Sequence, residues 1–165
     1  MIEVKKYGLE ILQEYGINLA VSMMALMPYS ALADEAETCM TEALYFEARS
    51  EGPVGMLAVA NVILQRVRSP SFPDDVCAVV HQGIRSSRGM LRNACQFSYF
   101  CDGKKEKMVD SRSEEEALYI SRLARDGAVV AAIEGSIHYH AWYVNPSWSN
   151  YKGRVGNHLF YGEQR

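Results

Sequence analysis

The segment EALYFEARSEGP, residues 42–53, joins two stretches whose apolar spacing predicts helices. Residues 34–47 repeat apolar side chains at the interval of one helix face. Pro53 suits the first position of the next helix, and residues 54–67 are apolar on nearly every side. We therefore expect a helix with one buried face, followed by a helix that lies at the centre of the domain.

The rest of the chain predicts, in order, a short helix over 74–81, loops over 83–110, a helix over 114–133, a strand over 137–144 and an irregular tail with a short strand at 159–161. Ser113 and Glu116 have the spacing of a capping box, so the last helix should begin after Ser113, and Gly135 is placed to end it. No repeat and no Gly/Ser-rich linker divides the chain. The predicted fold class is α+β and mainly helical, with one domain over 34–165 that contains a short β-hairpin or small sheet.

The composition excludes several classes of protein. The chain has 165 residues, 48% of them apolar and 22% charged, which rules out a collagen-like, low-complexity or disordered chain. The net charge of −3 argues against a nucleic-acid-binding protein, because such proteins usually carry a basic excess. The sequence also contains no glycine-rich phosphate loop and no Gly-x-Ser-x-Gly nucleophile motif.

Residues 1–33 have the composition of a targeting segment. Lys5 and Lys6 precede an uncharged stretch over 15–33, which Pro28 interrupts and a small-residue site ends. We predict a signal peptide that exports the protein to the periplasm or the exterior. Two alternatives are an uncleaved membrane anchor, which would tether the protein to the inner membrane, and an ordinary buried N-terminal helix.

The four cysteines all follow this segment, and an even number of cysteines in an exported chain favours disulfides. Cys95 and Cys101 enclose five residues and would close a small loop, which leaves Cys39 to pair with Cys77. A zinc site is the alternative, although the chain has no Cys-x-x-Cys pair. We predict the disulfides Cys39–Cys77 and Cys95–Cys101.

Glu47 is the candidate general acid. It continues the apolar face of the first helix, and a carboxyl group that loses hydration there has a raised pKa. Such a group can donate a proton near neutral pH. The alternative is a structural ion pair with Arg49, Arg66 or another cation. Glu51 lies one helical turn further along, and we expect it to be a cap or an exposed partner rather than a second catalytic carboxylate.

Aromatic and hydrogen-bonding side chains are mixed in HYHAWYVNPSW, residues 138–148, as in a groove that binds sugars, although the same composition also fits a core strand. With the short loop between two cysteines included, the predicted substrate-binding residues are Gln96, Phe97, Ser98, Tyr139, Tyr143, Asn145 and His158. His138 and His140 point to one side of a strand, so they could bind a metal. The third ligand would be His158 or His81. Hydrogen-bonded histidines are commoner, so we predict no metal and no cofactor.

Several separated blocks of this sequence share the order and composition of a known family. They are ALYFEARSEG at 43–52, GMLAVANVILQRV at 55–67, SPSFP at 69–73, VC at 76–77, CQFS at 95–98, CDG at 101–103, HYH at 138–140, NP at 145–146 and GNHLFY at 156–161. Together they cover about residues 39–161 and resemble the SleB-type cell-wall hydrolases, the spore cortex-lytic enzyme family.

This resemblance implies a small lysozyme-like fold of the lytic transglycosylase type. It also implies that the partner is peptidoglycan, cleaved at the β-1,4 bond between N-acetylmuramic acid and N-acetylglucosamine. The family's catalytic acid, the first Glu of a Glu-Ala-Arg-Gly-Glu motif, falls on Glu47, whereas Ser50 stands where the motif has Gly. A single Glu suffices if the muramic acid 6-hydroxyl attacks the sugar and leaves a 1,6-anhydro product; attack by water would give hydrolysis instead.

The resemblance leaves the biological setting open. We expect a monomeric enzyme of cell-wall remodelling or of phage-type host lysis. The alternative is a non-catalytic module that binds peptidoglycan and keeps the sugar groove.

Overall fold

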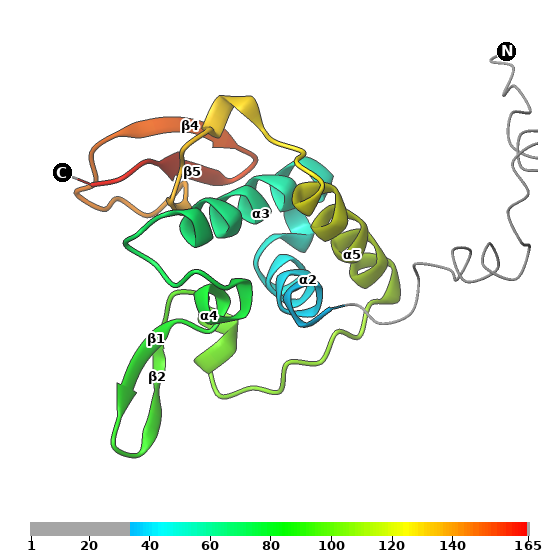
Figure 1. Cartoon of the computed structure of the whole chain (residues 1–165), viewed down its shortest axis with the longest axis vertical. Helices are drawn as coiled ribbons and strands as arrows, with labels where there is room; N and C mark the ends of the chain where they lie inside the picture. Colours follow the sequence, from blue (N-terminus) through cyan, green and yellow to red (C-terminus); the bar gives the residue numbers. More distant parts are fainter. Residues whose placement is uncertain (1–33, 165) are drawn as a thin grey trace, which may run out of the picture. The chain divides into compact units, whose positions relative to one another are not determined.

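The computed structural model describes residues 34–164. The signal peptide or membrane anchor predicted over 1–33 lies outside the described residues. Within the described part, no helix is long and apolar enough to span a membrane. Figure 1 shows this part as a group of helices accompanied by two small sheets.

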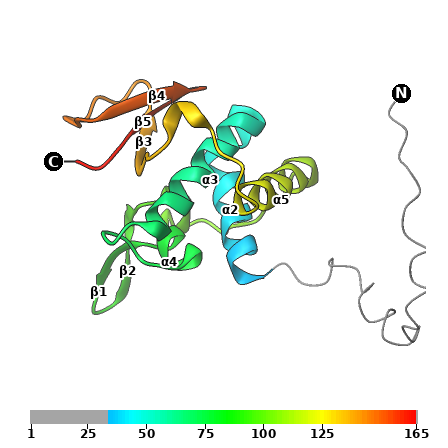
Figure 2. The same ribbon diagram turned by 45° about the horizontal axis from the view of Figure 1, so that its top comes forward.

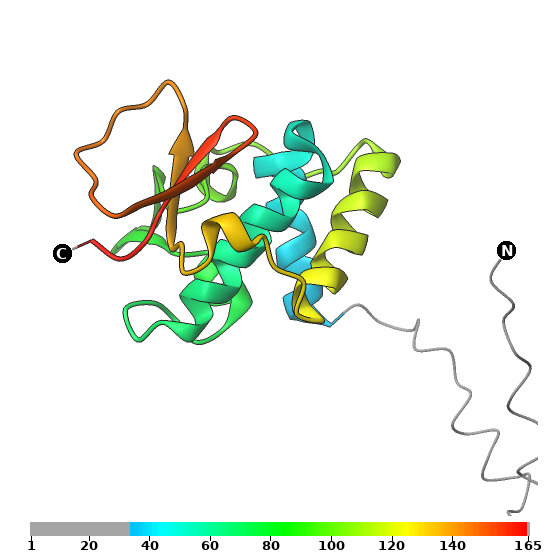
Figure 3. The ribbon, with the colours of Figure 1, turned by 90° about the horizontal axis from the view of Figure 1, so that it is seen from above.

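Three long helices of the described part form its main layer (Figures 1 and 3). They are α2 (Glu35–Ala48), α3 (Gly52–Arg68) and α5 (Ser111–Arg125), and the short helix α4 (Val76–Val80) packs against α2 and α3. A 3-10 turn, η1 (Arg49–Glu51), joins α2 to α3. The helices α2 and α3 confirm the two that the sequence predicts around its central segment.

The helix α3 lies between two apolar clusters, as its composition predicts. Val59 and Ile63 belong to the larger cluster, which they share with residues of α2, α4 and α5. Val62 belongs to a smaller cluster with Ile133 and Phe160. Burying an apolar side chain of this size contributes about 1.5–3 kcal/mol relative to leaving it exposed. The helix α3 is therefore the element that joins the helical layer to the C-terminal sheet.

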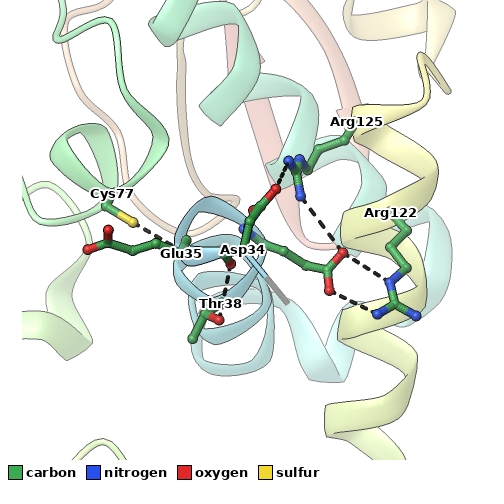
Figure 4. A network of polar contacts seen from close by, with 7 residues as sticks. Asp34, Glu35, Thr38, Cys77, Arg122 and Arg125 are labelled. Carbon is green, nitrogen blue, oxygen red and sulfur yellow. Dashed lines mark hydrogen bonds and ion pairs between the residues drawn. The ribbon is translucent and has the colours of Figure 1, made fainter. Parts of the chain in front are cut away.

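Ion pairs connect the start of α2 to the end of α5 (Figure 4). Glu37 is buried and accepts two hydrogen bonds from the Arg122 guanidinium, at 2.9 and 3.0 Å. Arg125 pairs with Asp34, whose carboxylate also accepts from the backbone N–H of Glu37 at 2.7 Å and so caps α2. A bidentate pair with a buried carboxylate is stronger than an exposed pair, so these contacts hold the two helix ends together.

Two antiparallel sheets complete the described part (Figure 2). One is a hairpin of β1 (Gly83–Ser86) and β2 (Gly89–Cys95). The other has the strand order β3-β5-β4, made by β3 (His138–Ala141), β4 (Tyr151–Val155) and β5 (His158–Tyr161). Figures 1 and 2 show the two sheets on opposite sides of α3. The predicted α+β class, mainly helical with a small sheet, is confirmed.

The hairpin β1–β2 corrects the expectation of loops over 83–110. Its sequence is rich in Gly, Ser and Arg, which favour turns and solvent and give no alternating apolar pattern. Most of β2 is exposed, so pairing with β1 rather than burial defines the strand. Gly89 has a φ of 112° at the turn, a conformation that favours glycine.

The helix α5 begins before the predicted position. Its N-cap is Asp110, whose carboxylate accepts from the backbone N–H groups of Arg112 at 3.1 Å and Ser113 at 3.2 Å. The capping box predicted at Ser113 is therefore wrong, because Asp110 is the N-cap and Ser113 already lies in the first turn of the helix.

The same helix ends at Arg125 and does not continue to residue 133 as predicted. Gly127 has a φ of 100°, which a helix interior does not contain. Asn61 of α3 then binds the backbone beyond it, donating to the Ala128 carbonyl at 2.9 Å and accepting from the Val130 N–H at 2.8 Å. The N–H groups of Gly127 and Ala128 bond back to the Ala124 and Leu123 carbonyls at 3.0 and 2.9 Å, so a glycine cap ends α5, and Asn61 fixes the segment that follows.

The C-terminal strands agree with prediction in part. The strand β3 covers the first half of the segment predicted over 137–144, and β5 matches the one predicted at 159–161. The strand β4 lies in the tail predicted to be irregular. Its sequence YKGRV has two cations, one glycine and a single aliphatic residue, so it carries little apolar signal. A 3-10 turn, η3 (Ala131–Ile133), precedes β3.

Two disulfides connect the elements around α2. The bond Cys39–Cys77 joins α2 to α4 with a Cα–Cα distance of 5.3 Å. The bond Cys95–Cys101 closes a loop between β2 and the 3-10 turn η2 (Ser98–Cys101), with a Cα–Cα distance of 6.0 Å. These are the two pairs that the sequence predicts, and with both bonds formed no thiol is left to hold zinc.

Candidate active site

Three elements bring polar groups to Glu47. The residue lies in the last turn of α2. The turn η2 presents the backbone N–H groups of Ser98 and Tyr99 and the Ser98 hydroxyl, which are hydrogen-bonded to the Glu47 carboxylate. The strand β3 contributes Tyr139, whose hydroxyl lies 3.5 Å from Glu47 Oε2. The carboxyl group therefore stands where the helical layer, the disulfide-closed loop and the C-terminal sheet meet.

Burial raises the pKa of Glu47, and the surrounding hydrogen bonds offset this only in part. Loss of water favours the carboxylic acid, whereas N–H and O–H donors favour the carboxylate. A raised pKa is what the sequence predicts for a carboxyl group on a buried helix face. Such a group can hold a proton until a reaction needs it, and the nearby donors then stabilise the carboxylate that forms.

No cation of the described residues forms an ion pair with Glu47. The guanidinium of Arg49 lies over the ring of Tyr45, 4.7 Å from its centre. Arg66 is buried and donates to the Ile137 carbonyl at 2.8 Å. Because both cations are engaged elsewhere, the predicted alternative of a structural ion pair is wrong for each of them.

The loop closed by the Cys95–Cys101 bond contains three predicted substrate-binding residues, and these differ in their exposure and contacts. Ser98 carries the hydroxyl that binds the candidate acid. Gln96 is exposed. Phe97 is fully buried, with its ring centre 5.5 Å from the Arg66 guanidinium, which corrects the prediction that it contacts substrate. Burial of its apolar ring holds the loop against the core instead.

Tyr139 and His158 form the sheet side of the site. Their rings meet edge to face with centres 5.1 Å apart, and Phe160 stacks on Tyr139 at 5.8 Å. Burial lowers the pKa of His158, so its imidazole is neutral near pH 7. The His158 Nδ1 atom is buried and has no hydrogen-bond partner among residues 34–164.

Glu51 supports a turn of the sheet. Its carboxylate accepts from the Asn157 backbone N–H at 2.8 Å and from the Asn157 side-chain amide at 3.2 Å. Burial acts to raise the pKa of Glu51, but the two bonds from Asn157 and the nearby His158 together lower it. Gly156 has a φ of 55° and lies against this carboxylate, so a Cβ there would collide with it. Glu51 is thus the partner predicted, and it holds the β4–β5 turn beside the site.

Tyr143 and Asn145 lie in the exposed segment that follows β3. Tyr143 is 75% exposed, and its ring meets that of Trp142 edge to face at 6.0 Å. No hydrogen bond or ring contact within the described part joins Tyr143 or Asn145 to Glu47. The structure therefore does not bring these two predicted binding residues to the candidate acid.

His138 and His140 lie on the opposite face of β3 from Tyr139. Both pack against Trp148, at 5.3 and 5.4 Å between ring centres, which confirms that they share a side. The two ring nitrogens of His140 have hydrogen-bond partners at 2.9 and 3.1 Å. His158 contacts Tyr139 and therefore lies on the other face of the sheet from His138 and His140. These three histidines do not converge on a metal.

Tyr99 is a residue of the site that the sequence does not predict. Its backbone N–H binds Glu47, and its ring stacks on Phe46 with centres 4.8 Å apart. The available signal was the short loop CQFSYFC, because a disulfide across so few residues forces the chain to turn and leaves neighbouring N–H groups outside regular pairing.

The sequence matches the family model described as Cell Wall Hydrolase over residues 50–161, which is more than half of the chain. The matched range begins just after Glu47. The Spore cortex-lytic enzyme of Halalkalibacterium halodurans is 54% identical over 43 residues, which are 26% of this chain and 13% of that protein. The chain therefore matches only a small part of that relative's length.

Two solved structures share the fold. The catalytic domain of the germination-specific lytic transglycosylase SleB from Bacillus anthracis has a TM-score of 0.60 and 24% identity, with 80% of this chain and 98% of that chain covered. The catalytic domain of the Bacillus cereus SleB protein has a TM-score of 0.56 and 23% identity, with 80% and 93% covered. These similarities establish the fold of a SleB catalytic domain.

Proposed function

The chain belongs to the SleB-type family of cell wall hydrolases, and from that premise we propose that it cleaves the β-1,4 bond between N-acetylmuramic acid and N-acetylglucosamine in peptidoglycan. Glu47 is the single catalytic residue of this proposal. The observation that carries it is the Glu47 carboxyl group, which is half-buried, has a pKa raised by desolvation and receives donors from a loop and a strand. Among the described residues, no cation neutralises it.

In the proposed reaction, Glu47 gives its proton to the glycosidic oxygen while the bond from that oxygen to C1 of the muramic acid breaks. Positive charge develops at C1, and the 6-hydroxyl of the same muramic acid attacks it. Glu47, now a carboxylate, takes the hydroxyl proton, which leaves a 1,6-anhydro product and restores the acid. If water attacks in place of the 6-hydroxyl, the same proton transfers give a product with a reducing end.

The surroundings of Glu47 favour a route with one carboxylate. During the reaction its negative form is stabilised by the backbone N–H groups of Ser98 and Tyr99. Glu51, which is close in the sequence, is held by two hydrogen bonds from Asn157 and supports a turn. A second catalytic carboxylate is not required when the substrate supplies its own nucleophile.

The substrate groove of this proposal extends from Glu47 along the sheet. Tyr139 and His158 form its inner wall, and the neutral imidazole can exchange a hydrogen bond with a sugar hydroxyl. The exposed Gln96 lies on the loop that binds the acid. Tyr143 and Asn145 would meet sugars further along the strand from the cleaved bond.

Peptidoglycan lies outside the cytoplasmic membrane, so the proposed function requires an exported protein. We assign this task to residues 1–33, as a cleaved signal or as a tether to the inner membrane, and catalysis to a single domain over 34–165. The enzyme would act as a monomer, in cell-wall remodelling or in phage-type lysis.

The test is a zymogram on purified peptidoglycan with the full chain. Wild type should clear the gel, and Glu47→Gln should lower the rate by at least about 10²-fold. The matched control is Glu115→Gln, an exposed carboxylate on α5, which should clear like wild type. Mass spectrometry of the released fragments then identifies anhydro or reducing ends. Clearing by Glu47→Gln at the wild-type rate would refute its role, and binding by wild type without clearing would identify a non-catalytic module.

A further inference from the structure

A cavity of about 230 Å³ adjoins the candidate active site. Phe46 and Tyr99 form its apolar wall, with ring centres 4.8 Å apart and planes inclined by 19°. Phe46 precedes Glu47 in α2, and the backbone N–H of Tyr99 binds the Glu47 carboxyl group. The cavity and the acid therefore share Tyr99, so an occupant of the cavity contacts a residue that also binds the acid.

The Tyr99 hydroxyl has no hydrogen-bond partner within residues 34–164, although the side chain is only 7% exposed. Leaving a buried hydroxyl without a partner costs about 1–3 kcal/mol. Burial, together with the carboxylates of Glu42, Glu47 and Glu106, raises the pKa of Tyr99, so the hydroxyl remains a donor. The hydroxyl is covered by the protein, so the cavity presents other atoms of Tyr99 to an occupant.

Charged side chains of both signs line the rest of the cavity. Arg49 comes from η1, and Lys104, Lys105 and Glu106 come from the loop after η2. Lys104 pairs with Asp102 at 3.1 Å. Two cations and one carboxylate of the lining thus have no ion-pair partner in the part of the chain that the structure describes.

The chemistry of peptidoglycan distinguishes two ligands for such a cavity. The glycan backbone offers no charge, because its N-acetyl sugars are neutral and its lactyl groups are bound as amides. The peptide stem on each lactyl group carries carboxylates and, on its diamino acid, an ammonium group. Only the stem matches a cavity with charges of both signs.

Resting on the proposed function, we propose that this cavity binds the peptide stem of the muramic acid at the cleaved bond. Arg49 and Lys105 bind a stem carboxylate, and Glu106 binds the ammonium group. The stem backbone packs over Phe46 and Tyr99. The enzyme therefore selects glycan strands that carry stems over strands that have lost them.

The first experiment compares intact peptidoglycan strands with strands stripped of their stems by an amidase, using the full chain. Wild-type kcat/KM should be about fivefold higher on intact strands, as expected of two exposed charge contacts. The variant Arg49→Gln/Lys105→Gln should lose this preference through KM. The control Arg88→Gln/Lys107→Gln makes the same change of charge at exposed residues outside the cavity lining, and it should keep the preference.

A second experiment separates this proposal from the proposed function. The Glu47→Gln variant is titrated calorimetrically with a muramyl tripeptide, which has no glycosidic bond to cleave. It should bind about fivefold tighter than the same variant with Arg49→Gln and Lys105→Gln added. Equal binding by the two variants, or equal wild-type kcat/KM on the two kinds of strand, overturns the stem site. If wild type cleaves neither strand, the proposed function fails, and the tripeptide titration still decides whether the cavity binds stems.

Discussion

Glu47 and Glu51 belong to one short segment, yet their carboxyl groups meet opposite environments. Burial raises the pKa of Glu47; it acts in the same direction on Glu51, but there the bonds from Asn157 and the nearby His158 prevail and lower the pKa. The backbone leaves helical geometry at Ala48, where φ is −136°, so Glu51 does not repeat the direction of Glu47. The end of α2 and the turn η1 therefore show that hydration and partners, and not spacing in the sequence, decide what a carboxylate can do.

The largest expected effect concerns the loop that donates hydrogen bonds to Glu47. It comes from removing the buried ring of Phe97. Phe97→Ala should lower the free energy of unfolding by about 3–5 kcal/mol, because the ring is fully buried and leaves a cavity. Activity should fall as well, since Phe97 positions the N–H groups of Ser98 and Tyr99. Urea denaturation measures the first effect and a peptidoglycan assay the second. Phe97→Leu should restore most of both, and a loss below about 1 kcal/mol for Phe97→Ala would contradict the role of an anchor.

The next effect concerns the closure of the same loop. Cys95→Ser/Cys101→Ser should lower the free energy of unfolding by about 2 kcal/mol, because the short loop is no longer constrained in the unfolded chain. It should also lower kcat by at least about tenfold, since the donors to Glu47 lose their fixed position. The control Cys39→Ser/Cys77→Ser opens the other disulfide, away from these donors, and should affect stability more than kcat. A wild-type kcat in the first variant would show that the loop is held without its disulfide.

The same contrast explains how much of the fold the sequence could predict. The helices α2 and α3 follow from local apolar spacing, because their buried faces repeat at the helical interval. The course of the chain after α5 does not, since Asn61 of α3 binds the backbone at Ala128 and Val130. The hairpin β1–β2 is mostly exposed, so no apolar pattern marks it. Local burial is visible in a sequence, and pairing between distant segments is not.

The candidate site likewise contains residues that the sequence could predict and residues that it could not. Glu47 could be found because it continues a buried helix face, whereas its donors at Ser98 and Tyr99 come from a distant loop. Phe97 belongs to the cysteine loop predicted to line the sugar groove, yet its ring is buried in the core. Ser50 stands where the motif has Gly; it lies in η1 and is not among the residues with positive φ, so the turn of this chain does not require glycine there.

A smaller effect on stability is expected when the Glu51 carboxylate is removed. Glu51→Gln should lower the free energy of unfolding by no more than about 1 kcal/mol, because the carboxylate is partly exposed and water screens it. The folded pKa of Glu51 lies below its ordinary value of 4.5, so this stabilisation is present above pH 4.5 and is lost as the pH falls through the lowered pKa. Thermal unfolding of wild type and variant should therefore differ at neutral pH and converge in acid. A difference that persists at about pH 2 would assign the effect to shape instead of charge.

The smallest expected effect has the opposite sign and concerns the stability of Glu47→Gln. The folded pKa of Glu47 is raised above 4.5, so the folded state binds this proton more tightly than the unfolded chain, and wild type loses stability as the pH rises from 4.5 through the raised pKa. Glutamine does not ionise and loses nothing in that interval. The Tm of Glu47→Gln should thus exceed that of wild type at neutral pH, and the two should approach each other below about pH 4, the reverse of the Glu51→Gln series. Calorimetry of both variants between about pH 3 and 8 measures this. A Glu47→Gln variant that is less stable than wild type at neutral pH would mean that the bonds from Ser98 and Tyr99 outweigh burial, and the physical basis for a protonated acid at this position would be gone.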